Sequence, residues 1–338
     1  MLVHRDKHEV RLRTSYARWL KQRSALEAYR VKPGDRRTTL PAVYDVSALF
    51  PDLAGRWRTT VRLHPRIGDE PPADASKMGG TFLWPANEPW PVCRAHQIPF
   101  VAVLQLRADD FPEMPFPPEA DLFQVLWCPR EHSDVPDCRQ KPCPMVWADP
   151  RFYWRSCRTI HQPVDNPIPQ DAYYEYVPFT CRLLPERVIE YPSVYDLPEE
   201  GVERIRTWED QNLGPDGMHA CEYEWDLSVA CGTKIGGYAK WIQSPWIPAC
   251  QCGRCMEHLL TIASWEWDGV IGRWTPAEER KILASFPGAW DEWSKEQKRI
   301  ELWLHAPTGL VLGDAGHMQL FVCRHCGAWP IVPNIECS

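Results

Sequence analysis

The chain has 338 residues, of which 44% are hydrophobic and 12% aromatic, so it can bury one large core or two ordinary ones. Its net charge of −7 argues against a nucleic-acid-binding protein, because Lys and Arg supply most of the affinity for phosphate. The chain lacks both an apolar run of about eighteen residues and an apolar N-terminal segment, so we expect neither a membrane span nor a signal peptide. These features predict a cytoplasmic protein.

The N-terminal part is basic. Residues 1–40 hold eleven Lys or Arg and four Asp or Glu, so the rest of the chain is more acidic than the net charge suggests. Apolar residues at loosely helical spacing predict an amphipathic helix over 6–30, with Trp19 and Leu20 as its buried contacts. We assign residues 1–55 to this N-terminal basic helical segment.

A repeated motif begins after a predicted strand at Arg58–His64. Lys-Met-Gly-Gly at 77–80 returns as Lys-Ile-Gly-Gly at 234–237, an offset of 157 residues. The same offset aligns Trp84 with Trp241 and Cys93 with Cys250. So many identities at one spacing indicate an internal duplication. The glycine pairs are typical of a turn or of a close backbone approach, and the context of a phosphate-binding loop is missing.

A second alignment closes each copy. Residues 121–128 match residues 316–323 at an offset of 195, which predicts a final strand ending in a cysteine in both copies. The larger offset indicates an insertion in the second copy, where helical spacing predicts helices at 276–286 and 289–305. A short helix is also predicted at 202–211.

These elements predict an α+β, β-rich fold. We expect two tandem, similar, mostly antiparallel β lobes with a structural zinc knuckle site and peripheral helices. The first repeat lobe spans 56–150, a Pro- and Tyr-rich connecting segment spans 151–230, and the second lobe spans 231–338. The helical insertion of the second lobe spans 271–305.

Two C-x2-C pairs carry the strongest chemical signal in the chain. Cys252 and Cys255 form the first pair, and Cys323 and Cys326 form the second. This spacing lets each pair aim two thiolates at one tetrahedral ion, so it predicts a closed structural Zn²⁺ site. Disulfide pairing is the alternative, which a reducing compartment disfavours. Cys250 is left out of this ligand set, because the repeat aligns it with Cys93 in a Pro-x-Cys motif that needs no metal. It stays a possible substitute for Cys252.

The first copy contains a possible second metal site. When the alignment of the two copies is shifted by two residues, the C-x2-C pairs of the second copy face residues of metal-binding types in the first copy. These residues are Cys93, His96, Cys128 and His132. A Cys2His2 set at these spacings suits a tetrahedral zinc ion. The alternative is that both cysteines are buried thiols and both histidines belong to surface loops.

The pattern Lys-[Met/Ile]-Gly-Gly-x3-Trp, the cysteine knuckle before an apolar strand, and Gln-x3-Cys resemble the YwqG-like family, also called domain of unknown function 1963. The second copy is also similar to the eukaryotic Tsr4 and programmed cell death protein 2 superfamily. The resemblance covers about residues 56–330. It implies a β-rich domain that binds a protein or peptide partner, as an immunity or chaperone-like factor, and it implies no established reaction.

A groove between the two lobes would suit such a partner, with aromatic anchors at Trp84, Trp90, Trp241 and Trp246. The alternative is that these side chains fill the two cores. No catalytic residue is predicted, because a zinc ion with four thiolates keeps no open position and no nucleophile motif occurs. A metal-dependent hydrolase acting on a small molecule stays the alternative, if the first site holds its ion with three ligands only.

Overall fold

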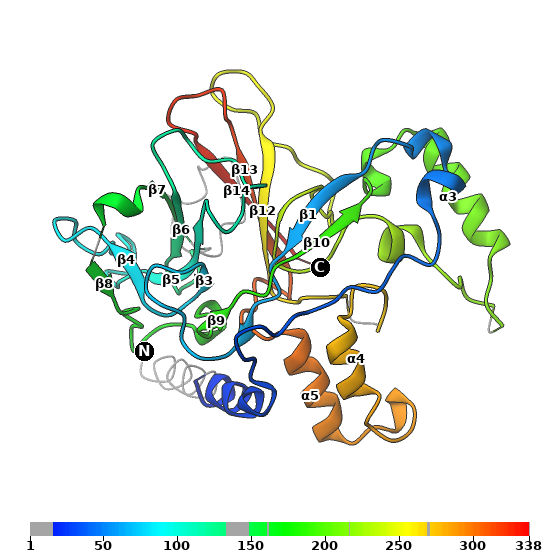
Figure 1. The fold of residues 1–338 in the computed structure, drawn as a ribbon, viewed down its shortest axis with the longest axis horizontal. Helices are drawn as coiled ribbons and strands as arrows, with labels where there is room; N and C mark the ends of the chain where they lie inside the picture. The colour runs from blue at the N-terminus through cyan, green and yellow to red at the C-terminus, as the bar shows by residue number, and fades with distance from the viewer. Residues whose placement is uncertain (1–15, 133–148, 161, 216, 269–270, 338) are drawn as a thin grey trace, which may run out of the picture.

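The computed structural model describes residues 16–132, 149–160, 162–215, 217–268 and 271–337. Two six-stranded antiparallel sheets form its centre (Figure 1). Sheet I has the order β2 (Arg66–Ile67), β9 (Cys181–Arg182), β3 (Lys77–Met78), β5 (Val101–Arg107), β6 (Leu122–Trp127) and β7 (Pro150–Arg155). Sheet II has the order β10 (Glu186–Glu190), β1 (Arg58–Arg62), β11 (Lys234–Gly236), β12 (Glu257–Ala263), β13 (His317–Val322) and β14 (Ile331–Glu336). Strands β4 (Phe82–Trp84) and β8 (Gln162–Val164) form a small third sheet.

The central strands are apolar on both faces because both faces are covered. Every residue of β6 and of β13 is buried, and six of the seven residues of β5 are buried. Such strands appear in the sequence as continuous apolar runs, which is why they are the easiest to predict. The α+β, β-rich and antiparallel character expected from the sequence is confirmed.

The two sheets are linked by strand segments that pass from one sheet into the other. Residues 58–67 leave sheet II as β1 and enter sheet I as β2, while residues 181–190 run from β9 of sheet I to β10 of sheet II. Strand β1 therefore pairs with β11, with Val61 opposite Ile235, although it lies in the segment predicted as the first lobe. One hydrophobic cluster includes buried side chains of both sheets.

The described helices lie at the periphery (Figure 1). Residues 16–26 are α-helical, and the further α-helices are α2 (Val46–Leu49), α3 (Glu199–Gln211), α4 (Ala277–Leu283) and α5 (Lys295–His305). Single turns of 3-10 helix are η1 (Glu27–Tyr29), η2 (Pro51–Leu53), η4 (Cys157–Thr159), η5 (Tyr174–Tyr176), η6 (Val194–Asp196) and η8 (Trp290–Glu292), and η7 (Tyr223–Leu227) is a π-helix. None of these helices is long and apolar enough to cross a membrane.

Helices α4 and α5 form within the two segments that the sequence predicts to be helical. Helix α5 begins at a capping box, in which the Ser294 hydroxyl accepts from the Gln297 N–H and the Gln297 side chain accepts from the Ser294 N–H. Helix α4 is fixed to the sheets by Glu279, whose Oε1 lies 2.5 Å from Arg37 Nε and 2.9 Å from Arg66 Nε. This buried carboxylate joins the insertion, the N-terminal segment and β2.

The N-terminal helix contacts the body through a tryptophan, as expected. Residues 16–26 are helical, and the part of the predicted helix before residue 16 lies outside the described residues. The Trp19 indole donates to the Val177 carbonyl at 2.9 Å and packs on the Phe179 ring. The expected burial of Leu20 is wrong, since it is 37% exposed, and Leu26 on the next turns is buried instead.

The two glycine pairs have the structural role expected of them. Gly79, Gly80, Gly236 and Gly237 all have positive φ, between 62° and 73°. A Cβ on Gly79 would lie 2.8 Å from the Phe179 carbonyl oxygen, and one on Gly237 would lie 2.0 Å from the Glu190 carboxylate. Both pairs therefore allow a close approach that no other residue tolerates.

Candidate metal centres

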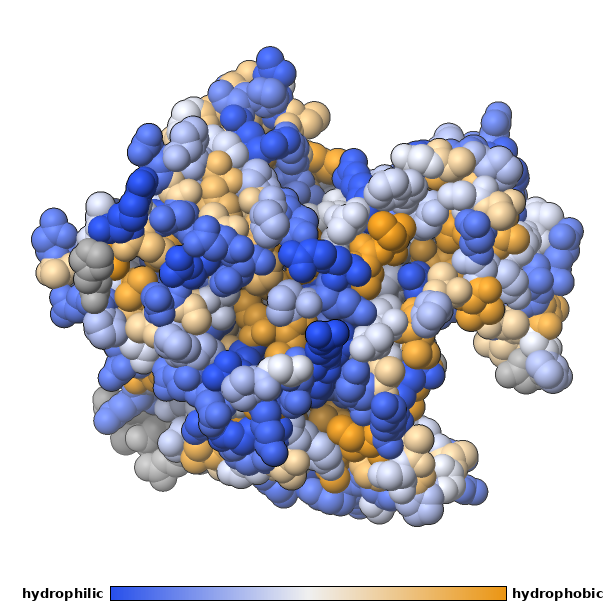
Figure 2. Space-filling view, viewed as in Figure 1, coloured by the Kyte–Doolittle hydropathy of each residue, from blue (hydrophilic) through white to orange (hydrophobic). Residues whose placement is uncertain are grey.

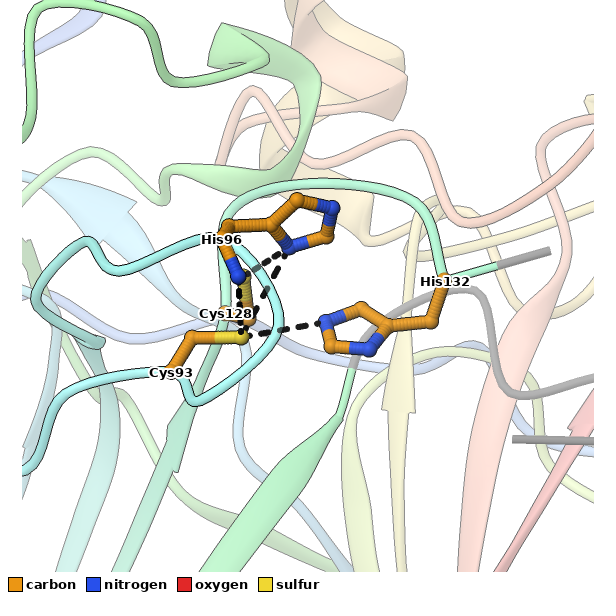
Figure 3. Close-up of side chains that lie close together, drawn as sticks. All are labelled: Cys93, His96, Cys128 and His132. Atoms are coloured by element: carbon orange, nitrogen blue, oxygen red, sulfur yellow. Dashed lines mark hydrogen bonds between the residues drawn. The ribbon is translucent and has the colours of Figure 1, made fainter. Parts of the chain in front are cut away.

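The first cluster is built by a hairpin and by the end of β6. In the hairpin Val92 pairs with Pro99, and the Cys93 N–H donates to the Ile98 carbonyl at 2.8 Å. Cys128 directly follows β6, and His132 lies four residues further on. Figure 3 shows the four side chains pointing toward a common centre. Their donor atoms all lie within 4.8 Å of one another, so the structure brings together the complete predicted set.

The spacing of these donors fits a tetrahedral metal ion. Cys93 Sγ lies 3.6 Å from His96 Nδ1 and 3.7 Å from His132 Nε2, and His96 Nδ1 lies 3.3 Å from Cys128 Sγ. A tetrahedral ion with bonds of about 2.3 Å to sulfur and about 2.05 Å to nitrogen sets neighbouring S and N ligands about 3.5 Å apart. The observed distances lie around this value.

Burial favours a cation at this centre. Cys93 and Cys128 have no exposed surface, and His132 is 2% exposed. Burial raises the pKa of the Cys128 thiol and lowers the pKa of His96, because it disfavours the charged form of each group. A neutral imidazole is the form that binds a metal, and a bound cation compensates a buried thiolate. The donor set is therefore chemically suited to a metal ion.

The second cluster is built in the same way in sheet II. Ala249 pairs with Cys255 in a hairpin, and the Cys250 N–H donates to the Arg254 carbonyl at 2.8 Å. The hairpin ends on a bond from Met256 N to Pro248 O at 2.9 Å, which matches the bond from Phe100 N to Pro91 O at 3.0 Å in the first hairpin. Cys323 directly follows β13, and the donors that meet are Cys250, Cys252, Cys323 and Cys326.

The sulfur distances fit a tetrahedral ion and exclude disulfides. Cys250 Sγ lies 3.6 Å from Cys326 Sγ, and Cys252 Sγ lies 3.6 Å from Cys323 Sγ. The sulfur atoms of Cys323 and Cys326 are 3.8 Å apart. Four thiolates about 2.3 Å from one ion are about 3.8 Å apart. A disulfide bond is about 2.05 Å long, so these cysteines are free thiols placed at ligand spacing.

The predicted ligand set of this centre needs one correction. Cys255 is not a member of the cluster, and Cys250 takes its place. Residues paired across a hairpin point to the same face, and alternate residues point to opposite faces. Cys255 is paired with Ala249 and is exposed, whereas Cys250 is on the other face and is buried. The motif that provides ligands is therefore Cys-x-Cys at 250–252, and the C-x2-C spacing of Cys252 and Cys255 is incidental.

The thiols of the second cluster differ in acidity. The Arg254 N–H donates to Cys252 and, with the neighbouring thiols, lowers the pKa of Cys252 to about 7. Hydrogen bonds with Cys250 and the other two thiols raise the pKa of Cys326 to about 12. Cys252 therefore loses its proton to become a metal-binding thiolate more readily than Cys326 does.

The sequence held the signal for Cys250. The offset of 157 residues aligns Cys93 with Cys250, and the matching hairpin bonds show that this alignment holds at the ligands. The two-residue slip that aligned Cys93 with Cys252 was wrong. The first hairpin pairs residues seven positions apart and the second pairs residues six apart, so one residue fewer separates the two ligands of the second hairpin.

The four tryptophans that were predicted to line a groove between the lobes do not lie along one groove in the structure. Trp84 is 2% exposed and packs with Trp90 in one hydrophobic cluster, while Trp241 is 5% exposed and packs on Phe321 in another. Trp90 and Trp246 are half-buried. Because Trp84 and Trp241 are core side chains of separate clusters, the four tryptophans do not line a common surface.

Comparison with known proteins gives a family. No curated protein matches the chain. The family model described as a domain of unknown function, DUF1963, matches residues 76–324. This range contains both hairpins, the central strands of both sheets and seven of the eight clustered donors, while Cys326 lies just beyond it. The chain therefore belongs to the DUF1963 family.

Proposed function

We propose that both clusters hold Zn²⁺ as closed structural sites. Thiolates and imidazoles in a tetrahedral arrangement suit zinc, whereas magnesium and calcium prefer oxygen ligands. Each cluster offers four protein donors, so a bound ion keeps no position for water and cannot activate it. This argues against the alternative of a metal-dependent hydrolase. Free thiols at these spacings also suit a reducing compartment such as the cytoplasm.

We also propose that the two halves arose by duplication, as two tandem β lobes that now share a core. Strands β3, β5, β6 and β7 have the same order in sheet I as β11, β12, β13 and β14 in sheet II. Gln124 donates to the Leu83 carbonyl and Gln319 donates to the Lys240 carbonyl, and the repeat offsets align both the donors and the acceptors. Kinship with the YwqG-like and Tsr4 proteins is part of this proposal.

For the protein as a whole, we infer that it binds a protein or peptide partner, as an immunity or chaperone-like factor. The observation that carries this inference is the open edge at β10. Strand β10 ends the order of sheet II and pairs with β1 alone among the described strands. The other long edge strands contain prolines, Pro150 in β7 and Pro333 in β14, and proline hinders strand addition. Strand β10 has none.

The surroundings of β10 suit a peptide strand. Ile189 on β10 is 44% exposed. Trp57, directly before β1, is 51% exposed, and Tyr195, five residues after the end of β10, is 56% exposed. Figure 2 shows apolar surface near this part of the molecule. Main-chain hydrogen bonds from an edge strand give affinity, and the neighbouring apolar side chains give selectivity. Metal sites that rigidify the sheets would hold this edge in place.

The experiment that tests this function uses a photo-crosslinking amino acid at Tyr195 in the full chain in cells. We expect one covalent adduct with a partner protein, and we expect Ile189→Lys to remove it, because a lysine on an edge opposes strand pairing. The control carries the same crosslinker at Trp290, which is exposed on the helical insertion. An adduct that is the same at both positions, or that survives Ile189→Lys, would contradict the proposal.

A further inference from the structure

A cavity of about 360 Å³ lies between the π-helix η7 and the segment that leads to α4. Three tryptophans and three carboxylates are among the residues that line it: Trp225, Trp267, Trp274, Glu222, Asp226 and Asp268. We call it the tryptophan pocket. In the π-helix the Ser228 N–H donates to the Tyr223 carbonyl, five residues back. Such turns occur often at functional sites.

The carboxylates of the tryptophan pocket are incompletely neutralised. Lys240 Nζ lies 2.9 Å from the Asp268 carboxylate. Arg273 donates to the backbone carbonyl of Asp226, at 3.0 Å, and not to its side chain. Within the part of the chain that the structure describes, no lysine or arginine forms an ion pair with Glu222 or Asp226. His219, which also lines the pocket, has its Nδ1 3.6 Å from the Glu222 carboxylate, and Asp226 Oδ2 accepts from the Glu222 N–H at 3.0 Å. The pocket therefore holds two carboxylates that no lysine or arginine of the described chain neutralises.

Three buried polar atoms beside the same pocket also have no partner in the described structure. They are Nε1 of Trp267, Nε1 of Trp274 and Oγ1 of Thr275, and each of these residues lines the pocket and is at most 2% exposed. A buried polar atom without a hydrogen bond costs about 1–3 kcal/mol, so such atoms are rare and need an explanation. Indole N–H groups can only donate, so a ligand that satisfies them carries an acceptor.

The aromatic side chains add a further preference. Trp225 is 49% exposed, and Lys240 Nζ already lies 4.8 Å from the centre of its ring. The Arg273 guanidinium lies 4.2 Å from the centre of the Trp274 ring. The chain itself thus places cationic side chains against these rings, which is the contact that a cationic ligand makes with tryptophan.

We propose that the tryptophan pocket binds the guanidinium side chain of an arginine residue in a partner protein. The guanidinium group pairs with Glu222 and Asp226, and its planar fork suits carboxylates better than an ammonium group does. The negative charge of the chain outside its N-terminal segment favours a basic partner. This inference rests on the proposed function and names the partner's chemistry.

The test is calorimetry with the full, metal-loaded chain and a ten-residue Gly/Ser peptide that carries two arginines. We expect binding that weakens at least tenfold when citrulline, which is neutral and nearly isosteric, replaces arginine. Glu222→Gln combined with Asp226→Asn should weaken it by a similar factor, and so should Trp225→Ala. The matched control is Trp290→Ala, because Trp290 is also exposed and also lies under a lysine, Lys298 at 4.5 Å.

Four outcomes would overturn the inference. The first is equal affinity for the arginine and citrulline peptides, and the second is unchanged affinity in the Glu222→Gln, Asp226→Asn variant. The third is no heat of binding at millimolar peptide. Tighter binding of free arginine than of the peptide would also overturn it, because the site would then serve a small molecule. If the Tyr195 adduct persists in any of these cases, the proposed function stands and only this inference fails.

Discussion

The two candidate metal centres have the same backbone arrangement, but their ligand types and their solvent exposure differ. In each, a hairpin supplies two donors and the segment after a central strand supplies two more. The first centre has two thiols and two imidazoles, and three of its four residues are buried. The second has four thiols, of which Cys252 is exposed. The register of the sheets therefore fixes where donors lie, whereas the residue types at these positions are free to vary.

The largest expected effect separates the two neighbouring cysteines of the second hairpin. Cys250→Ser should release one zinc ion and destabilise the protein by about 5 kcal/mol or more, because structural zinc contributes roughly 10 kcal/mol to small zinc domains. Cys255→Ser should change stability by about 0.5 kcal/mol or less, since it replaces an exposed side chain. Denaturant unfolding and limited proteolysis measure both. Equal effects of the two substitutions would show that the hairpin register is wrong.

A second comparison uses two buried lysines, Lys77 and Lys234, which occupy equivalent positions in the repeated motif. Lys234 Nζ lies 2.8 Å from the Glu190 carboxylate, whereas Lys77 Nζ donates to the carbonyls of Pro71 and Pro72. Lys234→Met leaves a buried carboxylate unpaired and should cost about 3–5 kcal/mol. Lys77→Met should cost about 1 kcal/mol or less, because the removal of a buried charge offsets the lost hydrogen bonds. Chemical denaturation of both variants checks the order, and the reverse order would contradict it.

The same Lys77 predicts a dependence on pH. Burial lowers the pKa of Lys77 from 10.5 to about 8, so between these values the unfolded chain binds a proton that the folded chain does not. Stability from this group therefore rises with pH across this window and is lost as the pH falls through about 8. Relative to Lys77→Met, the wild type should gain up to about 3 kcal/mol between pH 7.5 and pH 10.5. A constant difference in unfolding free energy would contradict this.

The sequence predicts the strands better than it predicts the ligands. Largely apolar runs such as 101–107 and 317–322 are buried on both faces. Such a run predicts a buried strand whichever strand it pairs with. Spacing alone could not select between Cys250 and Cys255, because the choice depends on which face of a short hairpin each side chain occupies. The repeat offset carried that information, since it aligned Cys250 with Cys93.

The tryptophans show a second limit. Trp84 and Trp241 each have the large apolar surface that a binding anchor needs. The sequence does not say whether this surface contacts a partner or a neighbouring strand. Their burial is decided by contacts with Tyr153 and Phe321, which are distant in the chain. The tryptophan pocket was not predicted for the same reason, because η7 and the segment before α4 are about forty residues apart.

The most direct test of the account is the zinc content of the purified full chain and of three variants, measured by elemental analysis without prior chelation. We predict two zinc ions per chain in the wild type and in Cys255→Ser, and one in Cys250→Ser and in Cys128→Ser. X-ray absorption of the two single-site variants should show two sulfur and two nitrogen ligands in Cys250→Ser and four sulfur ligands in Cys128→Ser. Folded wild-type protein without zinc would contradict the account, as would a Cys255→Ser protein that loses an ion while Cys250→Ser keeps both.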